Sequence, residues 1–346
     1  MKIFYAVQAT GNGHISRAME ILPFLQRYGE IDIFLSGANS SLQLDGPVKY
    51  RSKGLCIFYN ESGSISYLKT IKQFSPARLL KEARDLPVEK YDLVLNDFES
   101  ITSIACAYKK IPSVNFGHQA SFQSEKTPRP QKKDIVGEWI LKNYGRATQY
   151  IGLHFDSYDD FILPPVIKKE ILRAEPVDKG YITVYLPSYS DMELTKYFAP
   201  LKDFRFQVFS REVKQQIQSG NILFIPVDKD AFNKSLIHCK GIIAGAGFET
   251  PAEALYLGKK LLVIPIRGQY EQLCNAAALE KLGVASIKTL DHDFASAFQH
   301  WMDDKKETRL IPNHSTEAII SFLMHNCNSN QQKNDLDFLY PELVIN

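Results

Sequence analysis

Short apolar runs alternate with segments of helical periodicity along most of this chain, and the alternation occurs twice. In the first half, strands are predicted at residues 2–9, 31–36, 93–96 and 113–116, with helices at 16–28 and 101–109. In the second half, strands are predicted at 181–186, 205–209, 222–225 and 261–266, with helices at 191–198 and 232–238. Such alternation is typical of α/β domains with largely parallel sheets. The pattern therefore predicts two doubly wound units, although no internal sequence repeat is visible.

The junction between the two units is predicted after Phe161, where the periodicity stops. Residues 162–180 contain three prolines and show neither the strand period nor that of a long helix. A chain of 346 residues also exceeds the usual size of a single hydrophobic core. We therefore predict a first domain at 1–165, a second at 166–325, and a polar tail at 326–346 whose apolar end crosses back to the first domain.

Composition and charge indicate a soluble enzyme and argue against several other classes. Hydrophobic residues make up 45% of the chain, enough for two cores, and the net charge of +2 gives no general case for nucleic-acid binding. No apolar run reaches the length of a membrane span, and the first strand is too short for a signal peptide. The five cysteines are scattered without a C-x-x-C pair, which favours a reducing cytoplasm over a disulfide framework or a zinc site.

The most informative stretch is residues 241–283, where two predicted strands each lead into a helix. After the first strand, the small residues of the turn at 245–247 let a diphosphate approach the backbone, and the free N–H groups and dipole of the helix suit an anion. Glu253, one helical turn further along, is placed to accept ribose hydroxyl groups. After the second strand, Glu271 and Gln272 supply an acid and an amide that suit a sugar ring. Together these features predict a nucleotide-sugar site.

This order of parts resembles the donor-binding signature of GT-B glycosyltransferases, in particular the branch of the UDP-glycosyltransferases and the bacterial N-acetylglucosaminyltransferase that makes lipid II. The resemblance covers nearly the whole chain and implies two Rossmann-like domains that face a cleft. It assigns the phosphate turn to Gly245, Ala246, Gly247, Phe248, Glu249 and Thr250, the ribose to Glu253, and the sugar to Glu271 and Gln272. The sequence departs from the branch at two places, because the histidine-rich element is reduced to residues 238–240 and Glu271 replaces the usual Asp.

The segment A-T-G-N-G-H-I-S-R at residues 9–17 is a second chemical focus. It follows the first strand, at the edge where open α/β sheets bind ligands. A dinucleotide site is disfavoured, because Ser16 replaces the third glycine of that fingerprint and no convincing acid ends the second strand. The segment resembles the G-x-G-H loop of the same branch and the G-N-G-H-x-x-R opening of a bacterial and archaeal GT-B group. That resemblance implies that Gly13 makes room for ligand and that His14 is the general base, a role that suits an imidazole. The alternative is a His14 that only hydrogen-bonds within its loop.

Two further rim loops offer polar partners. Asp97 follows the strand at 93–96 and is the preferred carboxylate to orient His14, with Glu99 second; plant glucosyltransferases, which the chain resembles, use such a His–Asp pair. The alternative is that Asp97 caps the helix that begins near Ile101. His118 follows the next strand and, with Glu99, is assigned to acceptor binding or to service as a substitute base.

Three other features each allow both a functional and a structural interpretation. Asp291-His292-Asp293 has a D-x-D spacing known from metal sites, but its place before a helix favours capping, and neither a metal nor a cofactor is predicted. Ser188, after the strand at 181–186, is assigned to phosphate, with helix capping as the alternative. The basic loop at 126–133 offers a peripheral contact with anionic lipid or a charged acceptor, although a solvated loop is favoured.

The sequence therefore predicts a cytoplasmic hexosyltransferase that acts in cell-envelope synthesis or peripherally at the inner membrane face. Its expected co-substrate is a nucleotide sugar, and UDP is the preferred nucleotide. His14 as base favours inversion, and the phosphate turn would hold the leaving diphosphate without a metal. Two alternatives stay open: a nucleotide-sugar 2-epimerase on the same two-domain plan, and a nucleotide or carbohydrate sensor without catalysis. The sugar, the acceptor, with lipid and polysaccharide as candidates, and the oligomeric state are not specified by the sequence.

Overall fold

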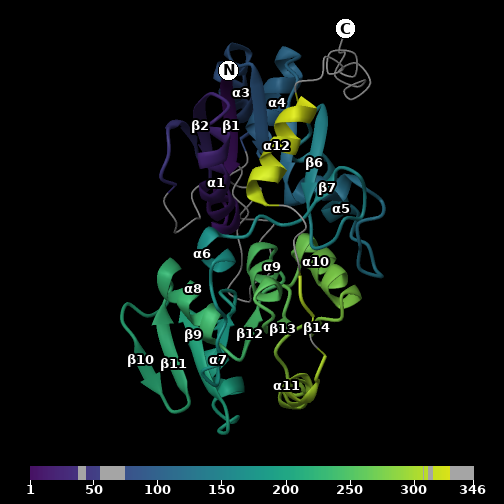
Figure 1. Ribbon diagram of the computed structural model, residues 1–346. Coiled ribbons are helices and arrows are strands. Elements are labelled where there is room, and N and C mark those ends of the chain that lie inside the picture. Colours follow the sequence, from purple (N-terminus) through teal and green to yellow (C-terminus); the bar gives the residue numbers. More distant parts are fainter. Residues whose placement is uncertain (38–43, 55–74, 307, 311–314, 328–346) are drawn as a thin grey trace.

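Two seven-stranded sheets organise the described part of the chain, one in each half (Figure 1). The computed structural model describes residues 1–37, 44–54, 75–306, 308–310 and 315–327. The sheets are covered by helices on both sides, so the predicted α/β architecture with two doubly wound units is confirmed.

The first sheet has the strand order β3-β2-β1-β4-β5-β6-β7, and all of its neighbouring strands are parallel. Its strands are β1 (Lys2–Gln8), β2 (Glu30–Ser36), β3 (Val48–Ser52), β4 (Leu93–Asp97), β5 (Val114–Gly117), β6 (Gln149–Leu153) and β7 (Ile162–Leu163). Its helices are α1 (Asn12–Leu25), α3 (Pro76–Asp85), α4 (Ser100–Lys109) and α5 (Ile135–Asn143), with short 3-10 turns η1 (Val88–Lys90) and η2 (His118–Gln123). The strand order reverses between β1 and β4.

The second sheet has the order β10-β11-β9-β8-β12-β13-β14, and among these described strands only the β10–β11 pair is antiparallel. Its strands are β8 (Tyr181–Tyr185), β9 (Arg205–Ser210), β10 (Ile217–Ser219), β11 (Ile222–Pro226), β12 (Gly241–Ala244), β13 (Lys260–Val263) and β14 (Ala285–Ser286). The accompanying helices are α6 (Lys169–Leu172), α7 (Asp191–Phe198), α8 (Lys229–His238), α9 (Glu249–Tyr256), α10 (Tyr270–Lys281) and α11 (Phe294–Asp303). Here the order reverses between β8 and β12.

Strand β1 shows why these apolar runs form central strands. Its side chains alternate between two cores, with Ile3, Tyr5 and Val7 in one cluster and Phe4 and Ala6 in another. A strand buried on both faces carries a continuous apolar run instead of an alternating one, as in other parallel sheets covered by helices. Burial of these side chains stabilises the sheet and fixes the positions of the polar residues that follow each strand.

Helix α12 (Thr316–Cys327) belongs in space to the first half of the molecule, where it packs against α1 (Figure 1). Arg27 at the end of α1 donates to Glu317 at 2.6 Å, and Tyr28 lies 3.2 Å from the Ser321 hydroxyl. The segment that crosses back to the first half therefore begins before the predicted tail at 326–346. Residues 328–346 of that tail lie outside the described residues.

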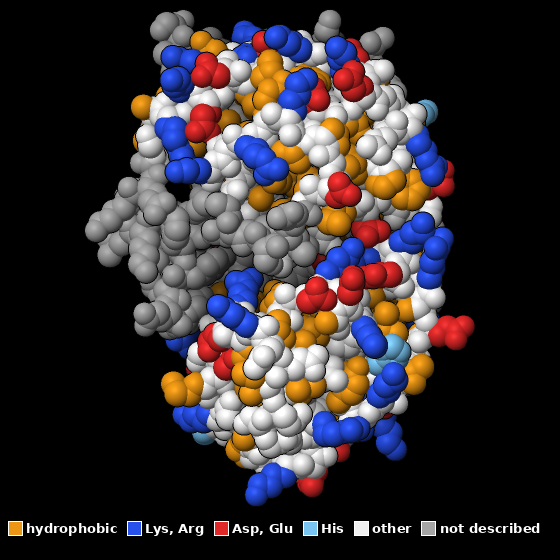
Figure 2. Space-filling view, turned by 90° about the vertical axis from the view of Figure 1, so that its left-hand side faces the viewer, with side chains coloured by type: hydrophobic (Ala, Val, Ile, Leu, Met, Phe, Trp, Pro, Cys, Tyr) orange, Lys and Arg blue, Asp and Glu red, His pale blue; other side chains and the backbone are white. Residues whose placement is uncertain are grey.

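Several sequence expectations can be compared directly with these elements. Helix α1 begins at Asn12, four residues earlier than predicted, so His14 lies on a helix and not in a loop. Within the described residues no helix is long and apolar enough to cross a membrane. The four described cysteines are free and Cys56 lies outside the described residues. On the face shown in Figure 2, basic and acidic side chains are interspersed over the described surface, in keeping with the small net charge.

Candidate active site

The two reversals of strand order lie where the predicted functional residues gather. In the first sheet, α1 with His14 follows β1, and Asp97 ends the neighbouring β4, where it pairs in register with Val7. In the second sheet, Ser188 follows β8 and Gly245 follows the neighbouring β12. Side chains at the carboxyl ends of two strands that diverge at such a point line a crevice, which is where doubly wound sheets bind ligands.

His14 and Asp97 are hydrogen-bonded as the sequence predicted, and Arg17 joins them. The Nδ1 atom of His14 lies 2.9 Å from Oδ1 of Asp97. Arg17, one turn further along α1, donates from Nη2 to both carboxylate oxygens of Asp97, at 2.7 and 3.0 Å. The His14 side chain is 13% exposed, whereas that of Asp97 is fully buried. With Nδ1 bound to the carboxylate, the Nε2 atom of the imidazole is the one left to accept a proton from a ligand.

The charge on Asp97 is held by its neighbours against complete burial. Burial acts to raise the pKa of Asp97, but Arg17 and His14 more than offset it, and the pKa lies below its usual range. For Arg17, burial acts to lower the pKa, and the carboxylates of Asp97 and Glu249 together raise it above its usual value. Both groups therefore remain ionised at neutral pH.

A strained turn carries Asp97 to the rim of the sheet. Phe98, the next residue, has a φ of 54°, a left-handed conformation that is costly for a bulky side chain. Asn96 closes the turn, since its Oδ1 accepts from Glu99 N–H at 2.6 Å and its Nδ2 donates to Glu99 C=O at 2.9 Å. This two-way clamp holds the strained backbone and thereby the direction of the Asp97 side chain.

Glu99, and not Asp97, caps helix α4. Its carboxylate accepts hydrogen bonds from the N–H groups of Ile101 and Thr102 and from the Ser36 hydroxyl, at 2.6 to 2.9 Å. Only 1% of Glu99 is exposed, and burial raises its pKa. The geometry thus gives the capping role that was considered for Asp97 to Glu99, whose two oxygens are both bonded and buried.

One pocket at the second crevice is lined by several of the residues that were predicted to bind the nucleotide-sugar donor. It is lined by Tyr185, Leu186, Pro187, Ser188, Ala244, Gly245, Gly247, Thr250, Ile266 and Gln272. A side chain added at Gly247 would meet open space, so the backbone there is accessible to a ligand. Gln272 reaches the pocket while its Oε1 accepts from Ile266 N–H at 2.9 Å, which fixes the loop after β13. The alternative for Ser188, helix capping, is filled by Ser190, whose hydroxyl accepts from Glu193 N–H.

Three residues assigned to the phosphate turn make contacts elsewhere. The Glu249 carboxylate points across to the first half, where it forms an ion pair with Arg17, and a side chain at Gly13 would collide with it. The Phe248 ring stacks on His118, with centroids 4.0 Å apart and planes 8° from parallel. Ala246 is buried, and its carbonyl accepts from Asn275 at 3.0 Å. Glu249 and Phe248 thus contact the first half of the molecule, whereas Ala246 is held within the second half by α10.

Glu253 is buried beneath a lysine from the segment that joins the halves. Its Oε2 accepts from Lys168 Nζ at 3.0 Å, and the same ammonium group donates to Asn233 at 3.1 Å. Only 2% of Glu253 is exposed. Burial raises its pKa, and Lys168 acts in the opposite direction. The carboxylate assigned to the ribose is therefore already paired with Lys168.

His118 is also buried, at 1% exposure, between the two halves. Its Nδ1 lies 3.0 Å from the Leu153 carbonyl and its Nε2 lies 2.8 Å from Oδ1 of Asn275. Burial lowers the pKa of His118. Next to it, Gln119 donates to Glu271 at 3.0 Å, so the acid assigned to the sugar is also held from the first half. His118 is thus placed to join the halves, whereas an acceptor would need access to it.

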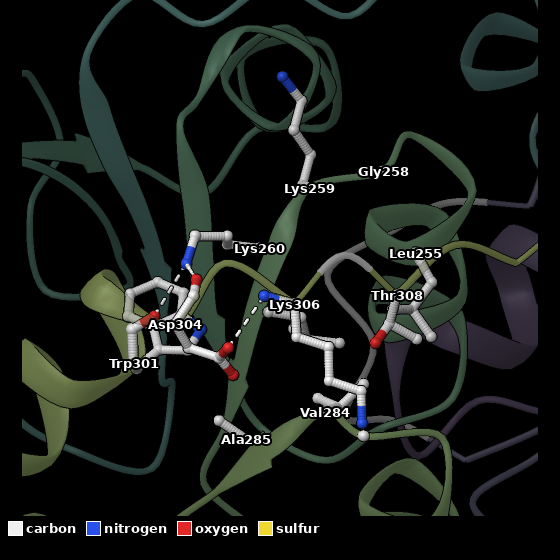
Figure 3. A pocket seen from close by; sticks show the side chains of 12 residues that line it. Leu255, Gly258, Lys259, Lys260, Val284, Ala285, Trp301, Asp304, Lys306 and Thr308 are labelled. Atoms are coloured by element: carbon white, nitrogen blue, oxygen red, sulfur yellow. Dashed lines mark hydrogen bonds between the residues drawn. The ribbon is translucent and has the colours of Figure 1, made fainter.

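Other candidate sites lie away from this region. Asp291, His292 and Asp293 bring three possible ligand atoms within 4.8 Å of one another. Asp291 accepts from Asp293 N–H at 3.0 Å just before α11, although Asp293 makes no capping bond with its side chain. Figure 3 shows a pocket in the second half near the first residue of β13. There Lys260 turns its ammonium group toward Trp301 and donates to the main-chain carbonyl of Trp301 at 2.9 Å. This lysine is engaged in holding the end of α11.

Comparison with known proteins decides between the alternatives that the sequence left open. The family model described as glycosyl transferase family 1 matches residues 1–303. The chain belongs to this family. It is therefore a glycosyltransferase, and neither a 2-epimerase nor a sensor is needed to explain the fold. No curated protein matches the sequence.

Solved glycosyltransferase structures match this family 1 protein over nearly its whole length. UGT89C1 of Arabidopsis thaliana, solved with UDP, is 13% identical with a TM-score of 0.57, and the match covers 99% of both chains. The glycotransferase of kitacinnamycin is 15% identical with a TM-score of 0.55 and 98% of both chains covered. The calicheamicin glycosyltransferase CalG4 is 12% identical with a TM-score of 0.53 and 99% of both chains covered. At these identities the likeness shows the GT-B fold alone.

Two charged residues of the candidate site were given no role from the sequence. Arg17 follows His14 by three residues, so a helix that begins at Asn12 puts both on one face. Its place as the last residue of the G-N-G-H-x-x-R opening was the available signal. Lys168 lies in the aperiodic segment at 162–180, and its pairing with Glu253 is a long-range contact for which the sequence offers no sign.

Proposed function

We propose that this glycosyltransferase moves a sugar from a nucleotide-sugar donor to a hydroxyl group of an acceptor. The observation that carries the proposal is the His14–Asp97 pair at one crevice, joined through Arg17 to Glu249 at the start of α9. The donor pocket at the other crevice begins with the glycines immediately before that helix. A base and a diphosphate site are therefore close enough to serve one reaction.

In the proposed reaction, Nε2 of His14 takes the proton of the acceptor hydroxyl while its oxygen attacks the anomeric carbon. The bond from that carbon to the diphosphate oxygen breaks, and its electron pair leaves with the nucleoside diphosphate. Backbone N–H groups at the turn before α9 and the Thr250 hydroxyl stabilise the leaving group, which makes a metal ion unnecessary in this proposal. Attack opposite the leaving group inverts the anomeric centre.

UDP is the proposed nucleotide. Two solved structures of UGT89C1 that share this fold contain UDP and UDP-L-rhamnose respectively. Glu253, which Lys168 holds through an ion pair, is proposed to bind the ribose, and Gln272 with Glu271 to bind the sugar. Calorimetry with UDP, GDP and dTDP tests the nucleotide, and tighter binding of GDP or dTDP than of UDP would contradict it.

The base assignment is tested by turnover with the UDP-sugar that the protein hydrolyses fastest. His14→Ala should reduce turnover by about 10²- to 10⁴-fold, the range for a lost general base, while UDP binds as before. The pH–rate profile of the unmodified enzyme should have an ascending limb that the variant lacks. Full turnover in His14→Ala would rule out His14 as the base.

We also propose a peripheral contact between helix α5 and an anionic lipid surface, because α5 exposes large apolar side chains beside lysines. Ile135, Val136 and Trp139 are 85%, 56% and 64% exposed, and Lys132 and Lys133 precede them at the surface. Apolar side chains with an interfacial Trp and flanking cations suit the headgroup region of a bilayer.

Vesicle sedimentation tests this contact. Trp139→Ser should reduce binding to vesicles that contain phosphatidylglycerol, and neutral vesicles should bind poorly. Tyr108→Ser is the matched control, since Tyr108 is 61% exposed on α4. Equal binding of both variants, or dimer formation through α5 in solution, would contradict the contact.

A further inference from the structure

A single arginine connects the base of the first half to the donor turn of the second half. The Arg17 side chain is 2% exposed, and its guanidinium group bonds through different nitrogens to two carboxylates. Nη2 donates to Asp97 in the first half, and Nη1 donates to Glu249, the first residue of α9 in the second half. Because both terminal nitrogens of the planar guanidinium group are bonded, the orientation of the group is fixed. A lysine, with a single ammonium group on a flexible chain, would not be fixed in this way.

That orientation bears on the protonation of His14. Nδ1 of His14 lies 2.9 Å from Asp97 Oδ1 and 3.0 Å from Arg17 Nη2, so it faces both an acceptor and a donor. If Nδ1 carries the proton and donates to Asp97, Nε2 is free to act as a base. If Nδ1 instead accepts from Arg17, the proton moves to Nε2 and the base is lost. The contacts of Nη2 with both oxygens of Asp97 favour the first tautomer.

We infer that Arg17 is a positioning residue that keeps His14 in its basic tautomer, and that Glu249 links this effect to the donor half. Glu249 holds the second terminal nitrogen of the guanidinium group, and it can do so only while the two halves are together. When Glu249 withdraws, the guanidinium loses one anchor and is free to turn toward Nδ1 of His14. The base is therefore competent only when the donor half is docked. This inference rests on the proposed role of His14 as base.

The same geometry gives Glu249 a role other than phosphate binding. Its carboxylate lies against Gly13, where any larger residue would collide with it, and it is directed toward the first half. Gly117 of the third rim loop is close to the same network, since a side chain there would approach Asp97 Oδ1 to 2.7 Å. Both glycines leave room for the Asp97–Arg17–Glu249 network and not only for ligand.

Nitrogen-15 NMR of histidine-labelled protein tests the inference without any substrate, with the His14 signals assigned by their loss in His14→Gln. The unmodified protein should show His14 with a proton on Nδ1 and a bare Nε2. Glu249→Gln and Arg17→Lys should shift the population toward a proton on Nε2. Glu138→Gln is the matched control, because Glu138 also pairs with a buried arginine, Arg129, and bonds across the halves to Tyr270, yet does not touch His14.

Kinetics give a second readout. Glu249→Gln should lower turnover by about 10- to 100-fold through misplacement of the base, with UDP affinity within about threefold of the original. The ascending limb of the pH–rate profile should move in Glu249→Gln and stay in place in Glu138→Gln. Unchanged tautomer and unchanged pH profile in both Glu249→Gln and Arg17→Lys, with only a lower melting temperature, would overturn the inference. If His14 is not the base, the His14→Ala variant keeps its turnover, while His14 in Glu249→Gln and Arg17→Lys still changes its tautomer. Failure of the proposed base and failure of the positioning role are therefore distinguishable.

Discussion

Glu253 illustrates, at the scale of one residue, how a structural partner changes what a substitution reports. The carboxylate is bonded to Lys168, whose side chain is 11% exposed, so removing the charge leaves a nearly buried ammonium group without its counter-ion. A loss of nucleotide affinity and a loss of stability are therefore both expected from the same substitution.

We expect Glu253→Gln to weaken UDP binding by about 1–3 kcal/mol, the loss for charge-assisted hydrogen bonds to the ribose, and to lower the melting temperature. Lys168→Met removes the same ion pair but keeps the ribose acceptor, so it should lower the melting temperature and leave UDP affinity intact. Calorimetry and thermal unfolding measure the two effects. Equal losses of affinity in both variants would give Glu253 a structural role only.

At the scale of elements, the turn between β4 and α4 stores strain beside the proposed base. Asn96→Ala removes the two hydrogen bonds that close this turn around Phe98, and Asn96 is fully buried. We expect a loss of about 1–3 kcal/mol in the free energy of unfolding, together with reduced turnover because Asp97 loses its direction.

The control for this variant is Asn221→Ala in the second half, where the Asn221 amide donates to three main-chain carbonyls away from the site. Denaturant unfolding should show a comparable loss of stability, while turnover stays at its original value. Loss of turnover in proportion to stability in both variants would show that the turn has no special connection to catalysis.

The elements themselves were largely predictable, and the failures have physical reasons. Central strands such as β1 carry continuous apolar runs that the sequence displays. The start of α1 was missed because Gly11, Asn12 and Gly13 have low helix propensity, which tertiary contacts override. The alternative role predicted for Asp97 was to cap α4. Glu99 fills that role instead, because the left-handed conformation of Phe98 brings the Glu99 carboxylate to the helix N–H groups. Long-range pairs such as Arg17 with Glu249 have no sequence signal at all.

At the scale of the whole molecule, buried histidines make stability depend on pH. Burial lowers the pKa of both His118 and His154, so both are neutral in the folded protein near neutral pH. In the unfolded chain they titrate near ~6.5 and bind protons that the folded state does not. The free energy of unfolding therefore falls as the pH drops from about 6.5 toward 5.

His154→Phe tests this dependence, since the ring sits among aromatic neighbours such as Phe155 and Tyr158. The variant should lose stability less steeply between pH 6.5 and 5, by up to about 1.4 kcal/mol per pH unit. The difference between the two profiles isolates His154 from Glu99 and Glu253, whose raised pKa values act in the opposite sense. His292→Phe, at an exposed position, should leave the slope unchanged; identical slopes in all three proteins would contradict the prediction.

Helix α12 has a consequence for how the halves are joined. Within the described residues, the chain leaves the first half through the segment that contains α6 and is back in the first half at α12, so the halves are connected at two places. A protease that cuts between Arg173 and Lys179 would sever one connection and leave the other intact. We expect the two fragments to remain together through gel filtration and to separate only in denaturant. Release of a free first half after such a cut would contradict the docking of α12 on α1. The attachment of the two halves therefore depends on the docked helix α12 as well as on the chain between them.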